Sequence, residues 1–89
     1  MGEIIPALEQ RIRGMSPNET IQIIARANKK VAYNTLLDYV KRQADSYQPH
    51  PSFSMVTAVM KKVDVVRLVT QDFVDFVNYD PPVEKPNYH

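Results

Sequence analysis

Apolar residues recur at helical spacing along the second half of the chain, between Ser52 and Tyr79. A stripe with alternating steps of three and four, interrupted only at Thr70, runs through Val56, Val59, Val63, Val66, Phe73 and Val77. This spacing is typical of an amphipathic helix that buries one face. Four further apolar residues make the stripe wider than a coiled-coil seam: Met55, Val65, Val69 and Phe76. The pattern predicts one long helix over residues 52–79 as the spine of the fold.

The valine content of this segment favours a second interpretation. β-Branched residues lose side-chain freedom in helices and suit strands, and Val63-Asp64-Val65 alternates as a strand does. The adjacent pair Val65-Val66 ends that alternation after about three residues, whereas the helical spacing persists over about six turns. Asp64 could also cap a new helix and divide the segment near Val63. The sequence therefore predicts helix, and leaves open whether residues 52–79 form one helix or two.

Shorter amphipathic segments precede this one. In residues 5–13, Leu8 and Ile12 share one helical face. Pro6 suits the first turn of a helix because its missing N–H costs nothing there, and Gly14 suits the end. A short helix is predicted, with its apolar face against the long one.

The strongest local signal in the chain follows directly. Ser16 and Glu19 match a capping box, and Pro17 falls at the first helical position. A helix is therefore predicted over residues 17–29. Its inward positions would be Ile21, Ile24, Ala25 and Asn28.

A third stripe predicts a helix over residues 33–47, separated from the previous helix by a short turn near residues 29–32. The stripe consists of Tyr33, Leu37, Val40, Ala44 and Tyr47. Pro49 and Pro51 end this helix, because a proline disfavours helical backbone in the residue before it. Residues 1–79 are thus predicted to be a single all-α domain, a small bundle of three to four helices. Residues 80–89 contain three prolines and no periodicity, which predicts an extended, mobile tail.

Composition excludes several kinds of chemistry. The chain of 89 residues has no cysteine, two histidines and two glycines, Gly2 and Gly14. A thiolate zinc site, a cysteine nucleophile and a glycine-rich phosphate loop are therefore excluded. No carboxylate cluster has metal-ligand spacing, and no nucleophile and base are paired at a recognisable spacing. We expect no catalytic residue, no cofactor and no metal.

Charge and hydropathy change the picture less. The net charge of +1 divides into +4 over residues 1–62 and −3 over residues 63–89, an asymmetry that suits self-association or a charged partner. No apolar run approaches the about 18 residues of a membrane span, and the N-terminus does not have the pattern of a signal peptide. These features favour a cytoplasmic protein without a membrane partner.

The leading functional hypothesis is a non-enzymatic protein–protein interaction module: a small subunit, adaptor or inhibitor of a larger assembly, or an oligomer that pairs through the helix at 52–79. The size and style suit a small accessory protein, for example from a phage. The predicted partner interface consists of Met55, Val59, Val66, Val69, Phe73 and Phe76. Its basis is that the apolar stripe is broad for so small a bundle.

The alternative is a small DNA-binding regulator with a helix-turn-helix in residues 18–46. Asparagine and basic side chains can contact base edges and phosphates. The predicted nucleic-acid contacts are Arg26, Lys29, Lys30, Asn34, Lys41 and Arg42. Against this reading, the turn lacks the usual glycine, Asp38 would face phosphates, and the domain is weakly basic for a DNA-binding protein.

Overall fold

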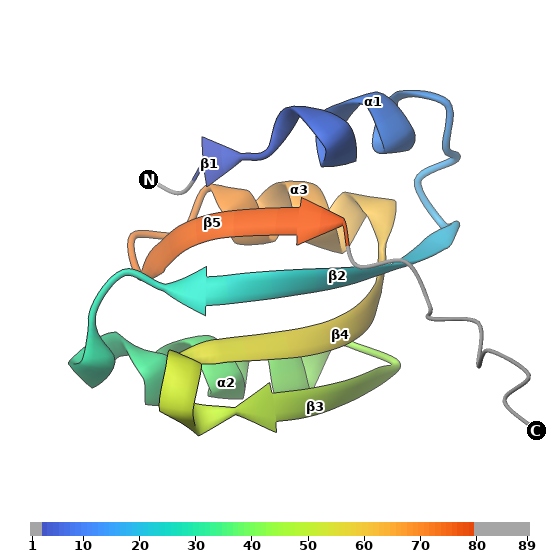
Figure 1. Cartoon of the computed structure of the whole chain (residues 1–89). Coiled ribbons are helices and arrows are strands. Elements are labelled where there is room, and N and C mark those ends of the chain that lie inside the picture. Colours follow the sequence, from blue (N-terminus) through green and yellow to red (C-terminus); the bar gives the residue numbers. More distant parts are fainter. Residues whose placement is uncertain (1–2, 80–89) are drawn as a thin grey trace, which may run out of the picture.

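A five-stranded sheet covered on one side by helices, and not a helical bundle, is the architecture of this protein (Figure 1). The computed structural model describes residues 3–79, except for the side chains of Glu3 and Lys30. In chain order the elements are β1 (Glu3–Ile4), α1 (Pro6–Arg13), β2 (Thr20–Ala27), η1 (Lys30–Ala32), α2 (Tyr33–Gln43), β3 (Ser46–His50), η2 (Pro51–Phe53), β4 (Met55–Lys61), α3 (Lys62–Val69) and β5 (Val74–Tyr79). The predicted all-α class is therefore wrong, and the chain is an α/β protein.

The strand order in the sheet is β1-β5-β2-β4-β3. Strands β5, β2, β4 and β3 pair antiparallel, and the short β1 pairs parallel to β5 at the edge. The units β2-α2-β3 and β4-α3-β5 interlock, so that each pair of parallel strands has a strand of the other unit between them. This is the split βαβ, or ferredoxin-like, arrangement, extended at its N-terminus by β1 and α1.

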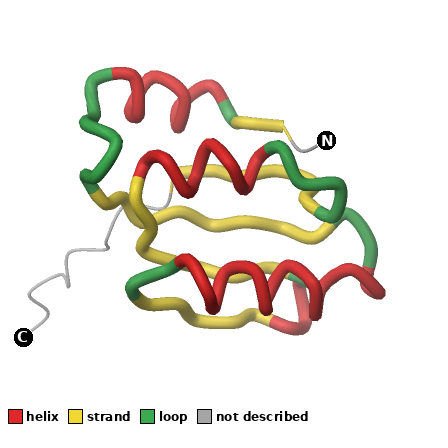
Figure 2. Tube along the Cα trace, turned by 180° about the vertical axis from the view of Figure 1, so that it is seen from behind, coloured by secondary structure: helices red, strands yellow, loops and turns green. Residues whose placement is uncertain are grey.

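Helices α2 and α3 lie on one face of the sheet, as the view from behind in Figure 2 shows, and α1 lies at the edge formed by β1 and β5. This placement follows from the alternation along β2, where Ile21, Ile23, Ala25 and Ala27 are buried and the residues between them are not. In a strand, successive side chains point to opposite faces. One face of β2 is thus the apolar floor of the core, and the other face is turned away from the helices.

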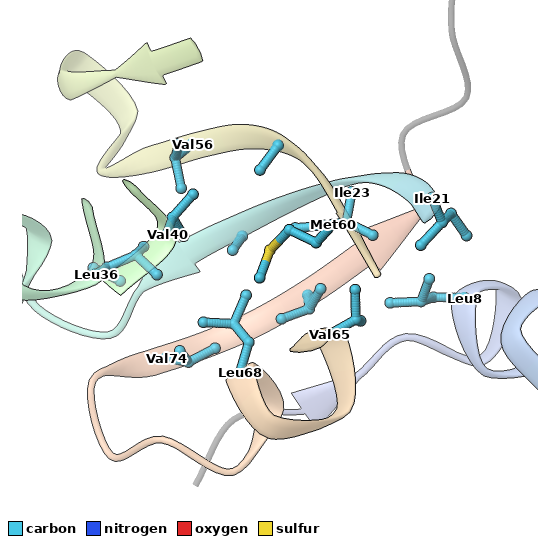
Figure 3. Packing of buried hydrophobic residues seen from close by; sticks show 14 of the residues in the cluster. Leu8, Ile21, Ile23, Leu36, Val40, Val56, Met60, Val65, Leu68 and Val74 are labelled. Atoms are coloured by element: carbon cyan, nitrogen blue, oxygen red, sulfur yellow. The ribbon is translucent and has the colours of Figure 1, made fainter. Parts of the chain in front are cut away.

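The core fills the space between the helices and this floor. In Figure 3, Leu8 of α1 approaches Ile21 and Val65, while Leu68 of α3 lies beside Val74. The fully buried side chains include Leu8, Ile23, Leu36, Met60 and Leu68, all at 0% exposure. Among the described residues, no polar or charged side chain is buried. Burial of apolar surface is therefore the main stabilising contribution to the fold.

The predicted spine over residues 52–79 is three elements. β4 alternates, with Val56, Ala58 and Met60 inward. α3 then buries Val65 and Leu68, and β5 buries Val74 and Val77. The large apolar residues recur at helical spacing only by chance, because they belong to two strands and a helix. The alternative that divided this segment near Val63 was closer to the structure, because α3 begins at Lys62. The part before the division is a strand, however, and not a helix.

The predicted helix over residues 17–29 is also wrong, although its start signal is real. The Ser16 amide donates to the Glu19 carboxylate at 2.9 Å, and the Glu19 amide donates to the Ser16 carbonyl at 3.0 Å. These bonds close a turn that leads into a strand. The Glu19 carbonyl then accepts from the Lys62 amide at 2.9 Å, a long-range bond made where β4 meets α3.

Other local predictions are confirmed. α1 spans Pro6–Arg13 with Leu8 and Ile12 buried, close to the predicted 5–13. The turn predicted near 29–32 is η1, and α2 begins at Tyr33 as predicted but ends at Gln43, so that Tyr47 belongs to β3. The tail predicted over residues 80–89 lies outside the described residues. Within residues 3–79, no helix has the length and apolarity needed to cross a membrane.

Candidate functional site

The sheet face opposite the helices carries an unusual mixture of side chains. We call this surface the open face. It comprises the outward positions of the three central strands: Thr20, Gln22, Ile24 and Arg26 of β2, Met55, Thr57, Val59 and Lys61 of β4, and Phe76 and Asn78 of β5. No other element of residues 3–79 packs on it, and the side facing the viewer in Figure 1 is this face. A solvated sheet face normally carries polar residues.

Four apolar side chains interrupt the polar character of the open face. Ile24, Met55, Val59 and Phe76 are all partly buried. They are not among the partly buried apolar side chains that pack against the core, which belong to Ile4, Met15, Ala32, Leu37, Tyr39, Ala44, Val69, Phe73 and Tyr79. The four therefore lie on the outer side of the sheet, separated from the core by the sheet itself, and the register places each of them opposite a polar or charged residue. We call these four side chains the second apolar layer.

Strand register arranges these residues in rows across the sheet. Arg26 lies between Phe76 of β5 and Met55 of β4, and Ile24 lies between Asn78 and Thr57. Directly opposed side chains in antiparallel strands have Cβ atoms about 4.5–5.5 Å apart. The aliphatic stem of Arg26 therefore extends the apolar surface while its guanidinium remains exposed.

The charge of the open face is of one sign. Arg26 and Lys61 are exposed at its two ends, and none of its ten positions is acidic. At the β3 edge the His50 ring and the Thr57 hydroxyl are hydrogen-bonded at 2.9 Å. The combination of apolar and basic side chains suits a partner surface that is apolar and acidic.

A cavity of about 390 Å³ adjoins the open face where β2 ends. We call it the Arg26–Lys29 notch. Its lining residues are Arg26, Ala27, Asn28, Lys29, Ser52, Phe53, Ser54 and Met55. Arg26 and Met55 belong to both the notch and the open face, so the two surfaces are continuous.

The predicted partner interface is divided by the fold. Met55, Val59 and Phe76 come together on the open face. The other three are elsewhere: Val66 of α3 is 47% exposed, Val69 packs on the core, and Phe73 contacts Tyr39 of α2 with ring centroids 5.7 Å apart. Ile24, which helical periodicity placed in the core, joins the first three. Strand alternation in residues 20–27 was the signal that would have found it.

The predicted nucleic-acid contacts are divided in the same way. Arg26 and Lys29 line the notch. Asn34, Lys41 and Arg42 are exposed on α2, in the helical layer, and the side chain of Lys30 lies outside the described residues. Because β2 occupies residues 20–27, the helix-turn-helix predicted over residues 18–46 is not formed, and contact of these residues with nucleic acid stays a prediction.

The larger cavity, about 570 Å³, lies at the other end of β2 between Arg11, Met15, Glu19 and Tyr79. The Arg11 guanidinium carbon is 5.4 Å from the centroid of the Tyr79 ring, a cation–π contact. Hydrogen bonds from the Ser16 amide and hydroxyl lower the pKa of Glu19 from its ordinary value.

Within residues 3–79 there is no group of three or more His, Asp or Glu side chains placed to hold a metal ion. Asp72 lies in the turn between α3 and β5, and Asp75 lies near the start of β5. Comparison with known proteins adds no further guide: no family model matches the chain, and no curated protein is similar to it.

Proposed function

We propose that this protein is a non-enzymatic protein–protein interaction module that binds its partner through the open face. The observation that carries the proposal is the second apolar layer formed by Ile24, Met55, Val59 and Phe76 on a face that no other described element covers. Apolar groups in contact with water favour association, and such a patch with a polar surround is typical of a binding surface. The alternative of a helix-turn-helix regulator is less well supported, because residues 20–27 form β2 and not the first helix of such a motif.

The rigidity of the sheet supports this role. The backbone of β2 is paired on both sides over Ile23–Arg26, with β4 and β5. Side chains on a doubly paired strand are held in position by the core behind them, so binding orders little that was free before. A small subunit, adaptor or inhibitor could present this face without a conformational change.

Site-specific photo-crosslinking tests the proposal. We would place p-benzoylphenylalanine at Val59 on the open face, and at Asp38 on α2 as the matched control. Irradiation of cells that make the full chain should give a discrete adduct from position 59 and none of the same mass from position 38. Light scattering of the purified chain then decides whether the adduct is a second copy or another protein.

A variant makes the test sharper. Ile24→Ala removes apolar contact area from the middle of the open face without adding charge, and truncation of a central interface residue weakens binding by about tenfold or more. The adduct yield from position 59 should fall accordingly in this variant. Equal adducts from both positions, or none from position 59, would show that the open face is not the binding surface.

A further inference from the structure

The Arg26–Lys29 notch has the composition of a site for an oxyanion. Arg26, Lys29, Ser52 and Ser54 are among its lining residues, and these residue types carry a guanidinium, an ammonium group and two hydroxyls. None of the described lining residues is acidic. Arginine and hydroxyl donors form their strongest hydrogen bonds with charged acceptors such as carboxylate and phosphate. The notch therefore favours an anionic group over a neutral one.

The backbone around the notch is held in place by long-range hydrogen bonds. The Ala27 amide donates to the Ser54 carbonyl at 2.9 Å, and the Asn28 amide donates to the Phe73 carbonyl at 3.0 Å. The Asn28 side-chain amide donates to the carbonyl of Asp72. The end of β2 is thus tied to both neighbouring loops, and the two basic side chains start from a fixed backbone.

The β3–β4 connection contributes the opposite wall. Ser54 adopts the left-handed conformation, with φ 55° and ψ 35°, and its amide donates to the Pro51 carbonyl at 3.2 Å. A non-glycine residue in this region is strained, and such strain concentrates at functional sites. The tight turn leaves Phe53 at the rim with 65% exposure. An apolar aromatic surface therefore stands beside the two cations.

We infer that the notch binds the carboxylate of an acidic peptide segment of the partner, with an adjacent apolar side chain against Phe53. This inference rests on the proposed function, since the partner is then a protein. The notch shares Arg26 and Met55 with the open face, so one bound segment can reach both surfaces. Charge complementarity sets the orientation of the bound segment. Its apolar side chains contact the second apolar layer, and the carboxylate at the end of the segment lies in the notch.

A small probe tests the notch separately from any partner. We would titrate the full chain with N-acetyl-phenylalanine, which joins a carboxylate to an aromatic ring, and follow backbone amides by NMR. Its neutral amide and inorganic phosphate are the comparison ligands. Shifts should cluster at residues 26–29 and 52–55 with the carboxylate and be absent with the amide. Scattered shifts, or equal shifts with the amide, would overturn the inference; phosphate binding as tightly as the carboxylate would overturn its peptide part.

Paired variants complete the test. Arg26→Gln with Lys29→Gln should weaken binding of N-acetyl-phenylalanine by about tenfold or more, because hydrogen bonds to a charged group are lost. Lys41→Gln with Arg42→Gln on α2 removes the same charges at a distant surface and should leave the affinity for N-acetyl-phenylalanine unchanged. If both double variants bound the probe equally weakly, the loss would result from the net charge of the protein and not from the notch, and the inference would be overturned. The crosslink from position 59 separates the two proposals: an undiminished crosslink in the Arg26/Lys29 variant overturns the notch alone, whereas probe binding without any crosslink overturns the open face alone.

Discussion

Ile23 and Ile24 are adjacent residues of the same type on opposite faces of β2. Ile23 is completely buried between the sheet and the helices, opposite Ala58 of β4. Ile24 is partly exposed on the open face, between Thr57 and Asn78. A helix over residues 17–29 would reverse these positions, with Ile24 inward. Replacing each by alanine therefore tests the fold and the identity of the open face together.

The magnitude follows from burial. Ile23→Ala removes three buried carbons at about 0.8 kcal/mol each and leaves a cavity, so we expect a loss of about 3–4 kcal/mol in the free energy of unfolding. Ile24→Ala removes the same atoms from a surface that water already reaches, and we expect about 1 kcal/mol. Because both changes are made in one strand, the loss of β-propensity is common to both and cancels in the comparison.

Urea unfolding followed by far-ultraviolet circular dichroism measures both variants. Folded domains have about 5–15 kcal/mol of stability, so Ile23→Ala could leave little folded protein, and Ile23→Val provides a smaller step of about 0.5–1.5 kcal/mol. Ile24→Val is its control and should be close to neutral. If the substitutions at position 24 destabilised the protein as much as those at position 23, the assignment of the two faces would be wrong.

Three further changes test the contacts around the core and the turns. Tyr33→Phe deletes the hydrogen bond from the Tyr33 hydroxyl to the Met55 carbonyl, 3.0 Å, and should cost about 1 kcal/mol in chemical denaturation; no loss would mean that water replaces the hydroxyl. Ser54→Gly relieves the left-handed backbone and should raise the melting temperature by a few degrees, a gain of about 0.5 kcal/mol, whereas a lower value would place the strain elsewhere. The pKa of Glu19 is lowered in the folded state by the Ser16 hydrogen bonds, so its contribution to stability is present above the unfolded pKa and lost as pH falls through the folded one. Glu19→Gln should therefore be less stable than the natural protein at pH 7, with the difference disappearing in acid, and a difference independent of pH would refute the role of the charge.

Local sequence identified the elements whose stabilising contacts are close in the chain. Leu8 and Ile12 place α1 correctly because one helical face is defined by residues four apart. The turn at Ser16–Glu19 was recognisable for the same reason, since both of its hydrogen bonds join residues three apart. The strand that follows this turn, β2, was not recognisable. A capping-box pattern defines the turn only and carries no information about the strands with which the next segment pairs.

The candidate site was recognised in part. Met55, Val59 and Phe76 were selected as interface residues and do share a surface, but on a sheet face and not along a helix. Arg26 and Lys29 were predicted to belong to one site, and both line the notch because they are close in sequence. Their proximity to Ser54 could not be seen in the sequence, since it results from the pairing of Arg26 with Met55 and from the hydrogen bond between the Ala27 amide and the Ser54 carbonyl.

The sequence by itself determined α1, most of α2, the turns that precede β2 and α2, and the alternation of apolar residues along β2. It did not determine whether residues 20–27 and 55–61 are strands, because a strand is stabilised by hydrogen bonds to partners far along the chain. Valine and isoleucine fit either state until those partners exist. Only the tertiary structure, in which β2 pairs with both β4 and β5, decided that one set of these side chains forms the core and the neighbouring set forms the open face.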